Sequence, residues 1–231
     1  MTRTVNVVRL QLVNKMTYIW IPLIILVGAW VLTLAIYAML SGNGAPGPFY
    51  GGGSQAPLWY FLVVGIQALT FTFPFSQAMS ITRREFYLGT LLTAALTAAI
   101  LSTVFLLGGF IEIATRGYGM DGYFFRIDAL WAAGWWVAWL AYFAIAMLMF
   151  VVGFWAATIY KRWGTIAITV VLVGLGLLLV GAMWLTGRLD AWAEVFAWFG
   201  AQGALGLTLW GILLTALLAG TSYLTLRHAV P

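Results

Sequence analysis

Residues 18–40 read YIWIPLIILVGAWVLTLAIYAML, a run of 23 residues without one charged side chain. An α-helix rises about 1.5 Å per residue, so such a run is long enough to cross the ~30 Å hydrocarbon core of a bilayer. It is too long to be the apolar core of a secretory signal peptide. We therefore expect a retained transmembrane helix at about residues 17–40.

The rest of the chain has a similar composition. Hydrophobic residues make up 64% of the 231 positions and charged residues only 7%, whereas about 25% of the residues of a soluble domain are charged. A soluble fold of this length could not bury so much apolar surface, because surface area falls too slowly with size. We expect one all-α membrane domain over residues 1–231, with further transmembrane helices at about 58–80, 90–114, 128–158, 165–186 and 203–226.

The Lys and Arg residues indicate how these six helices are oriented. Eight of the 11 would lie on one side of the membrane, and positive charge is enriched in cytoplasmic loops. This predicts that both termini are cytoplasmic. The net charge of +5 is scattered in ones and twos, which disfavours a nucleic-acid surface. The cytoplasmic group comprises Arg3, Arg9, Lys15, Arg83, Arg84, Lys161, Arg162 and Arg227, and the outer group comprises Arg116, Arg126 and Arg188.

Residues that would perform chemistry are scarce. The centres of the predicted helices carry no ionisable side chain that could bind a coupling ion. The nearest is Glu112, which we expect at the outer interface, held by water or by Arg116. There is no Cys, the one histidine is His228 near the chain end, and no phosphate-binding loop or metal-ligand spacing occurs. We expect no catalytic residue, metal site or cofactor in this chain, so another subunit would have to supply energy for transport.

The connection between the second and third predicted helices carries the clearest motif. Residues 81–89 read ITRREFYLG, in which Thr82 and Glu85 fit the S/T-x-x-E capping box that starts a helix. Ile81 and Phe86 occupy the positions of the accompanying hydrophobic staple. From the residues alone, this segment is equally consistent with a docking point for a partner and with a rigid hairpin anchored by two arginines.

Residues 79–89 resemble the cytoplasmic loop of membrane-spanning permease subunits of class-two-superfamily ABC exporters. The resemblance rests on Ile81-Thr82-Arg83-Arg84, then Phe86 and Gly89, while Ser80 stands where that family often has Gly. Residues 160–164, YKRWG, are similar to the family's aromatic-basic turn between its fourth and fifth helices. The six-helix layout with a cytoplasmic N-terminus agrees with the family over the whole chain.

The resemblance implies a function that composition does not. A short coupling helix after the second transmembrane helix would dock on a separate ATPase, which would hold ATP and Mg²⁺. The chain would be no enzyme itself and would pair with a second permease copy, identical or related. It would export a hydrophobic or amphipathic substrate across a bacterial plasma membrane. The coupling residues would be Thr82, Arg83, Arg84, Glu85 and Phe86, with a second cytoplasmic contact at Lys161 and Arg162, and residues 3–16 as a membrane-surface helix.

Other interpretations remain open for three features. The whole chain could instead be a non-transporting scaffold or regulatory subunit. Residues 190–199 predict a short interfacial helix on the outer surface, which either gates release or, as we favour, simply lies on lipid. Gln67, Thr70 and Gln77 share one face of a helix that Pro74 should kink, and this face either lines a substrate cavity or makes ordinary interhelical hydrogen bonds.

Overall fold

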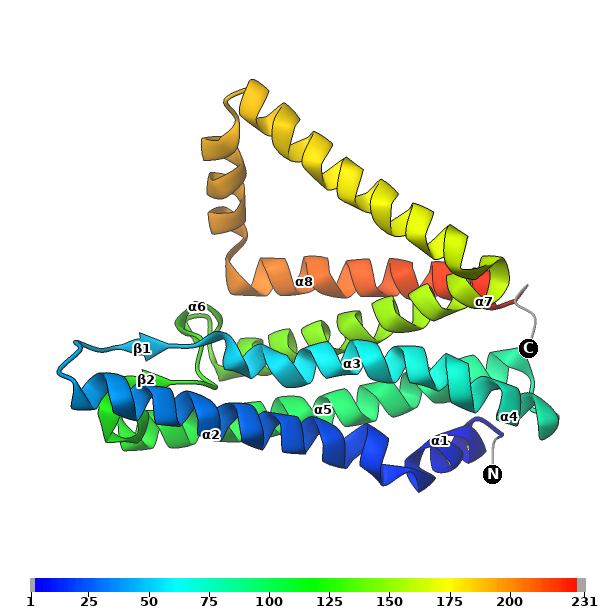
Figure 1. The fold of residues 1–231 in the computed structure, drawn as a ribbon, viewed down its shortest axis with the longest axis horizontal. Coiled ribbons are helices and arrows are strands. Elements are labelled where there is room, and N and C mark those ends of the chain that lie inside the picture. The colour runs from blue at the N-terminus through cyan, green and yellow to red at the C-terminus, as the bar shows by residue number, and fades with distance from the viewer. Residues whose placement is uncertain (1–2, 228–231) are drawn as a thin grey trace.

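The computed structural model describes residues 3–227 and is helical over most of that length. Helices α2, α3, α5 and the first part of α7 run side by side as a bundle, and a two-stranded sheet and α6 lie at one end of it (Figure 1). The helices are α1 Arg3–Val13, α2 Ile21–Gly42, α3 Ala56–Gln67, α4 Phe73–Ala78, α5 Arg83–Thr115, α6 Asp128–Trp131, α7 Trp135–Arg188 and α8 Trp192–Leu226. Strands β1 (Phe49–Tyr50) and β2 (Gly122–Tyr123) pair in parallel.

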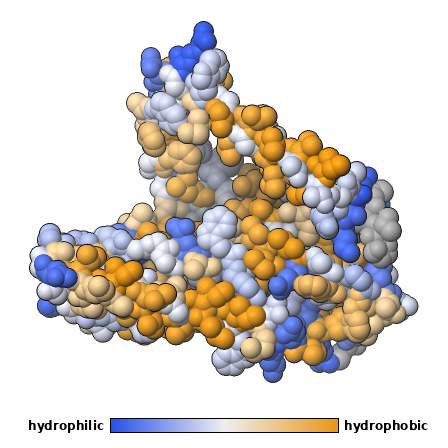
Figure 2. Space-filling model, in the orientation of Figure 1, coloured by the Kyte–Doolittle hydropathy of each residue, from blue (hydrophilic) through white to orange (hydrophobic). Residues whose placement is uncertain are grey.

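Five helical segments of the described chain are long and apolar enough to cross a membrane. Broad apolar patches lie on the visible face of the molecule, between more polar ones (Figure 2). Such a surface is stable only where the surroundings are apolar too. The prediction of an all-α membrane protein is confirmed at this level. The segments are Met16–Gly42, Gly52–Ala78, Arg83–Thr115, Trp135–Arg188 and Trp192–Leu226.

Two glycines bend the last two helices. Gly164 in α7 has φ 79° and ψ −172°, and Gly203 in α8 has φ 60° and ψ −176°. These angles are accessible to glycine and strained for other residues. Each helix turns sharply there, and the second limb of α7 and both limbs of α8 form a triangular frame beside the bundle (Figure 1). The limbs are 135–163 and 165–188 of α7, and 192–202 and 204–226 of α8. Their breaks fall close to the predicted starts at residues 165 and 203.

The structure differs from the expected elements in several places. No separate coupling helix precedes the third predicted helix, because α5 continues without a break from Arg83. The predicted helix at 128–158 is interrupted by Gly134 at φ 110°, which separates the single turn of α6 from α7. A π-helical segment, Ala68–Thr72, joins α3 to α4 just before Pro74, where a kink was expected. The β1–β2 pair had no sequence signal at all.

Helices α3 and α7 cross with their backbones in contact. A Cβ atom added at Gly65 would lie 2.1 Å from the Phe150 carbonyl oxygen, and one at Gly153 would lie 2.0 Å from that of Leu62. Either distance is far below van der Waals contact. Glycine at both positions is therefore a condition of the crossing, as is common where membrane helices pack closely. The buried rings of Phe61 and Phe150 belong to the core around this crossing.

We predict that Gly65→Ala and Gly153→Ala each destabilise the protein by about 1–3 kcal/mol, because the helices must separate to admit a methyl group. Gly174→Ala is the matched control, since a Cβ there meets nothing within 4 Å. It should be neutral or slightly stabilising, because alanine favours helix. Thermal unfolding in detergent, followed by tryptophan fluorescence, measures the difference. Equal melting temperatures for all three variants would contradict the crossing.

Candidate functional site

The α4–α5 hairpin is specified from both sides. Helix α4 ends in a Schellman motif. The amide of Ile81 donates to the Ser76 carbonyl (3.1 Å), and the amide of Ser80 donates to the backbone carbonyl of Gln77 (3.0 Å). Ser80 has φ 55°, a conformation that favours glycine, the residue the resembling family often carries here. Because both chain ends of the turn are hydrogen-bonded, the hairpin has a defined shape.

The predicted capping box is confirmed. Thr82 is the N-cap of α5, and its hydroxyl accepts from the Glu85 amide at 3.3 Å. The Glu85 carboxylate accepts in return from the Thr82 amide at 3.1 Å. These bonds satisfy two of the amides that a helix start leaves without partners.

The remaining predicted coupling residues separate into different environments. Phe86 is fully buried against Phe73, with ring centroids 5.2 Å apart, so it is part of the core and not of an accessible docking face. Arg83 reaches α8, where its guanidinium donates to the carbonyl oxygens of Arg227 (2.6 Å) and Leu226 (3.3 Å). Arg84 is exposed and faces the groove between α5 and α8. The exposed tip of the hairpin consists instead of Met79, Ser80 and Thr82.

Tyr87 is a functional candidate that the sequence did not single out. Its hydroxyl donates to the Ala219 carbonyl of α8 at 2.6 Å and lies 3.0 Å from the Ser222 hydroxyl. Its ring also packs against Phe154 of α7 and Tyr223 of α8. Tyr87 and Arg83 therefore join the first turns of α5 to the last turns of α8.

Helix α1 packs on the same part of α5. Gln11 is buried and donates to the Thr90 hydroxyl at 2.7 Å. Val7 is fully buried, and a Cβ added at Gly89 would lie 2.5 Å from the Cβ of Val7. Gly89, one of the residues that carry the family resemblance, thus permits the close approach of α1. Helix α1, Arg3–Val13, covers most of the membrane-surface helix predicted at residues 3–16.

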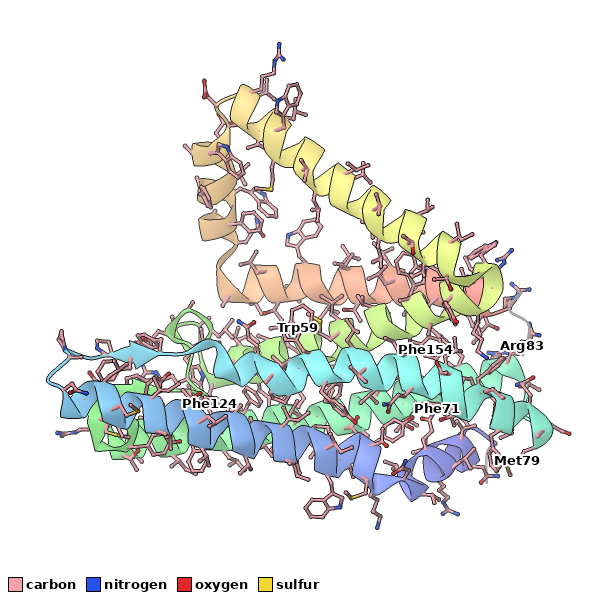
Figure 3. All side chains as sticks on the ribbon, viewed as in Figure 1. Trp59, Phe71, Met79, Arg83, Phe124 and Phe154 are labelled. Carbon is pink, nitrogen blue, oxygen red and sulfur yellow. The ribbon has the colours of Figure 1, made fainter. Side chains whose placement is uncertain are left out.

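The second predicted cytoplasmic contact lies at the same end of the bundle. Lys161 and Arg162 immediately precede the bend at Gly164, which Figure 1 places at the end where α1 and α4 lie. Figure 3 shows Met79 and Arg83 at that end, with Phe124 toward the opposite one. The Arg162 guanidinium lies 4.2 Å from the centroid of the Trp163 ring. The α4–α5 hairpin and the bend of α7 thus lie at the same end of the bundle.

The predicted cavity face makes local hydrogen bonds. The Thr70 hydroxyl donates to the Ile66 carbonyl at 2.9 Å, within its own helix. Gln77 donates to the Ile81 carbonyl at 3.2 Å, across the turn of the hairpin. Gln67 is half-buried.

Glu112 is the one fully buried acid among the described residues. Its two carboxylate oxygens accept from the amides of Phe124 (2.9 Å), Phe125 (3.0 and 3.1 Å) and Arg126 (2.8 Å). The expectation that Arg116 or water holds this carboxylate was wrong, because the backbone of the loop after β2 folds over it. A carboxylate bonded in this way anchors the loop to α5 and is not placed to bind and release a coupling ion.

We predict that Glu112→Gln lowers the apparent melting temperature by roughly 5 °C or more, because a carboxamide turns an N–H group toward buried amides that need acceptors. Glu194→Gln is the control, since Glu194 is exposed. Residues 117–127 should also become more sensitive to limited proteolysis in the Glu112 variant only. Identical melting temperatures and cleavage patterns in the two variants would contradict the anchoring role of Glu112.

The end of the bundle that carries the strand pair also carries a polar cluster. The Tyr50 and Tyr123 rings stack with centroids 5.7 Å apart, and Arg126 forms an ion pair with Asp128 at 2.9 Å. The Tyr50 hydroxyl donates to the Asp128 carboxylate. This bond, together with burial and the nearby negative charge, raises the pKa of Tyr50 to about 12.

Within residues 3–227, no group of three or more His, Cys, Asp or Glu side chains could hold a metal ion; His228 lies outside the described residues. Comparisons with protein-family models, curated proteins and solved structures found no match. The hairpin and its ties to α8 are therefore the basis for assigning a function.

Proposed function

We propose that the chain is the membrane-spanning permease subunit of an ATP-driven exporter of the class-two ABC superfamily, working with a separate ATPase. The observation that carries the proposal is the doubly capped α4–α5 hairpin. Its Thr82 cap begins a helix of 33 residues, and Arg83 and Tyr87 join that helix to α8. A force applied to the hairpin would therefore move α5 and α8 together.

The proposal includes a six-span topology with both termini in the cytoplasm. The limbs of α7 would cross the membrane separately, since the second limb at 165–188 is roughly 35 Å long. The first limb of α8, 192–202, would lie at the outer surface, and the second would return to the cytoplasm. The bend at Gly164 and the α4–α5 hairpin lie at one end (Figure 1). That end contains most of the basic residues, which supports a cytoplasmic location.

In the proposed mechanism the hairpin tip, Met79 to Thr82, docks on the ATPase. Arg84 lies next to this docking surface, at the groove between α5 and α8. Lys161 and Arg162 form the second contact with the ATPase. ATP and Mg²⁺ bind to the partner, and its closure pushes the hairpins of two permease copies. The polar face of Gln67, Thr70 and Gln77 would line the path between the copies. A hydrophobic or amphipathic substrate fits this path, because Glu112, the one fully buried acid of the described residues, is already hydrogen-bonded by backbone amides.

We predict that the tagged chain, extracted in mild detergent from its native membrane, retains a stoichiometric ATPase with a phosphate-binding loop. Met79→Glu should abolish this association, because Met79 is 56% exposed at the tip and the new charge would have to be desolvated at the interface. Val13→Glu is the matched control: Val13 is 81% exposed at the end of α1. Quantitative mass spectrometry of the bound proteins measures the ratio.

Recovery of the chain without an ATPase would contradict the proposal, as would full association of the Met79→Glu variant. A scaffold or regulatory subunit could also dock an ATPase through this hairpin. ATP hydrolysis by the reconstituted complex separates the two functions. A permease predicts hydrolysis that hydrophobic substrates stimulate, whereas a scaffold predicts no response.

A further inference from the structure

A groove opens between the first turns of α5 and the last turns of α8. Its cavity has a volume of about 470 Å³. The α5 wall consists of Arg84, Tyr87 and Leu88, and the α8 wall of Ala219, Gly220 and Tyr223. A Cβ added at Gly220 would meet nothing within 4 Å, so this glycine leaves the groove open.

The groove has positive charge that the described chain does not neutralise. The ion pair of Arg126 with Asp128 lies at the opposite end of the bundle. Arg83, next to Arg84, donates to backbone carbonyls of α8, and Arg227 is exposed at the end of that helix. Arg84 is exposed, and among the described side chains it forms no ion pair with a carboxylate.

The rest of the groove offers apolar contact. The Tyr87 hydroxyl already bonds to Ala219 and Ser222, so it presents mainly its ring. Leu88, Ala219 and Gly220 add aliphatic surface. A ligand that fits such a groove has an anionic head for Arg84 and an apolar chain beyond it. Basic pockets between transmembrane helices on the cytoplasmic side bind lipid head groups by this chemistry.

We propose that this groove binds one anionic phospholipid, with the phosphate on Arg84 and an acyl chain between Leu88 and Gly220. In the proposed topology Arg84 lies level with the head groups of the cytoplasmic leaflet, where such lipids are concentrated. The proposal goes beyond the exporter function and requires no ATPase. The lipid would fill the space between the two helices that Tyr87 and Arg83 already join.

The test uses the purified full chain in detergent and native mass spectrometry, with phosphatidylglycerol and phosphatidylcholine as probes. The wild type should retain one phosphatidylglycerol with about a tenfold preference over phosphatidylcholine, because the choline cation beside the phosphate is repelled by Arg84. Arg84→Gln should lose the preference and Arg84→Lys should keep most of it. Gly220→Leu should weaken binding of both lipids by filling the groove. Lys15→Gln, at an exposed cation of the same end, is the control.

Three results would overturn the proposal. These are equal retention of the two lipids by the wild type, an unchanged preference in Arg84→Gln, and displacement of phosphatidylglycerol by millimolar inorganic phosphate, which would indicate an anion site alone. Circular dichroism and melting of each variant verify its fold. If Gly220→Leu does not fold, the lipid preferences of Arg84→Gln and Arg84→Lys still test the proposal. Because no ATPase is present, this outcome is independent of the docking result.

Discussion

The close contact of α3 with α7 is the constraint on which the rest of the structure depends. Without a side chain at Gly65 or Gly153, backbone meets backbone, and the two helices can adopt only a narrow range of positions. Helix α7 then supplies the surface against which α5 and α8 pack. In a bilayer the lipid is as apolar as the side chains, so close packing and hydrogen bonds replace the hydrophobic effect as the force between helices.

Helix α5 carries a polar anchor near each of its ends. The Thr82–Glu85 capping box fixes its start, and Glu112 near its end holds the loop after β2 through three backbone amides. Hydrogen bonds to α8 from Arg83 and Tyr87 lie close to the first anchor. A movement of the hairpin would thus pass along a helix whose two ends are both fastened to neighbouring segments. In the proposed function, this continuity would let the hairpin act as a coupling element.

Local features of the sequence predicted local features of the structure. The apolar runs identified the long helices, and the spacing of Thr82 and Glu85 identified a helix start that the structure confirms. The predicted helix starts at residues 165 and 203 lie next to Gly164 and Gly203. Both glycines have positive φ, which ends the preceding helical limb. The separate coupling helix was wrong, because nothing after Thr82 interrupts α5. The burial of Phe86 and the partners of Arg83, Tyr87 and Glu112 depend on segments distant in sequence, which spacing and composition do not encode.

The sidedness of the α4–α5 hairpin relative to the bend at Gly164 tests the central claim most directly. The chain has no cysteine, so each single-cysteine variant can be labelled without background from native thiols. Ser80→Cys and Arg162→Cys mark the two turns, and Asn43→Cys and Glu194→Cys mark the opposite side. With an impermeant maleimide on intact cells, we expect labelling at positions 43 and 194, and labelling at 80 and 162 only after permeabilisation. Labelling of Ser80→Cys in intact cells, or of positions 80 and 162 from opposite sides, would contradict the six-span topology and the coupling role of the hairpin.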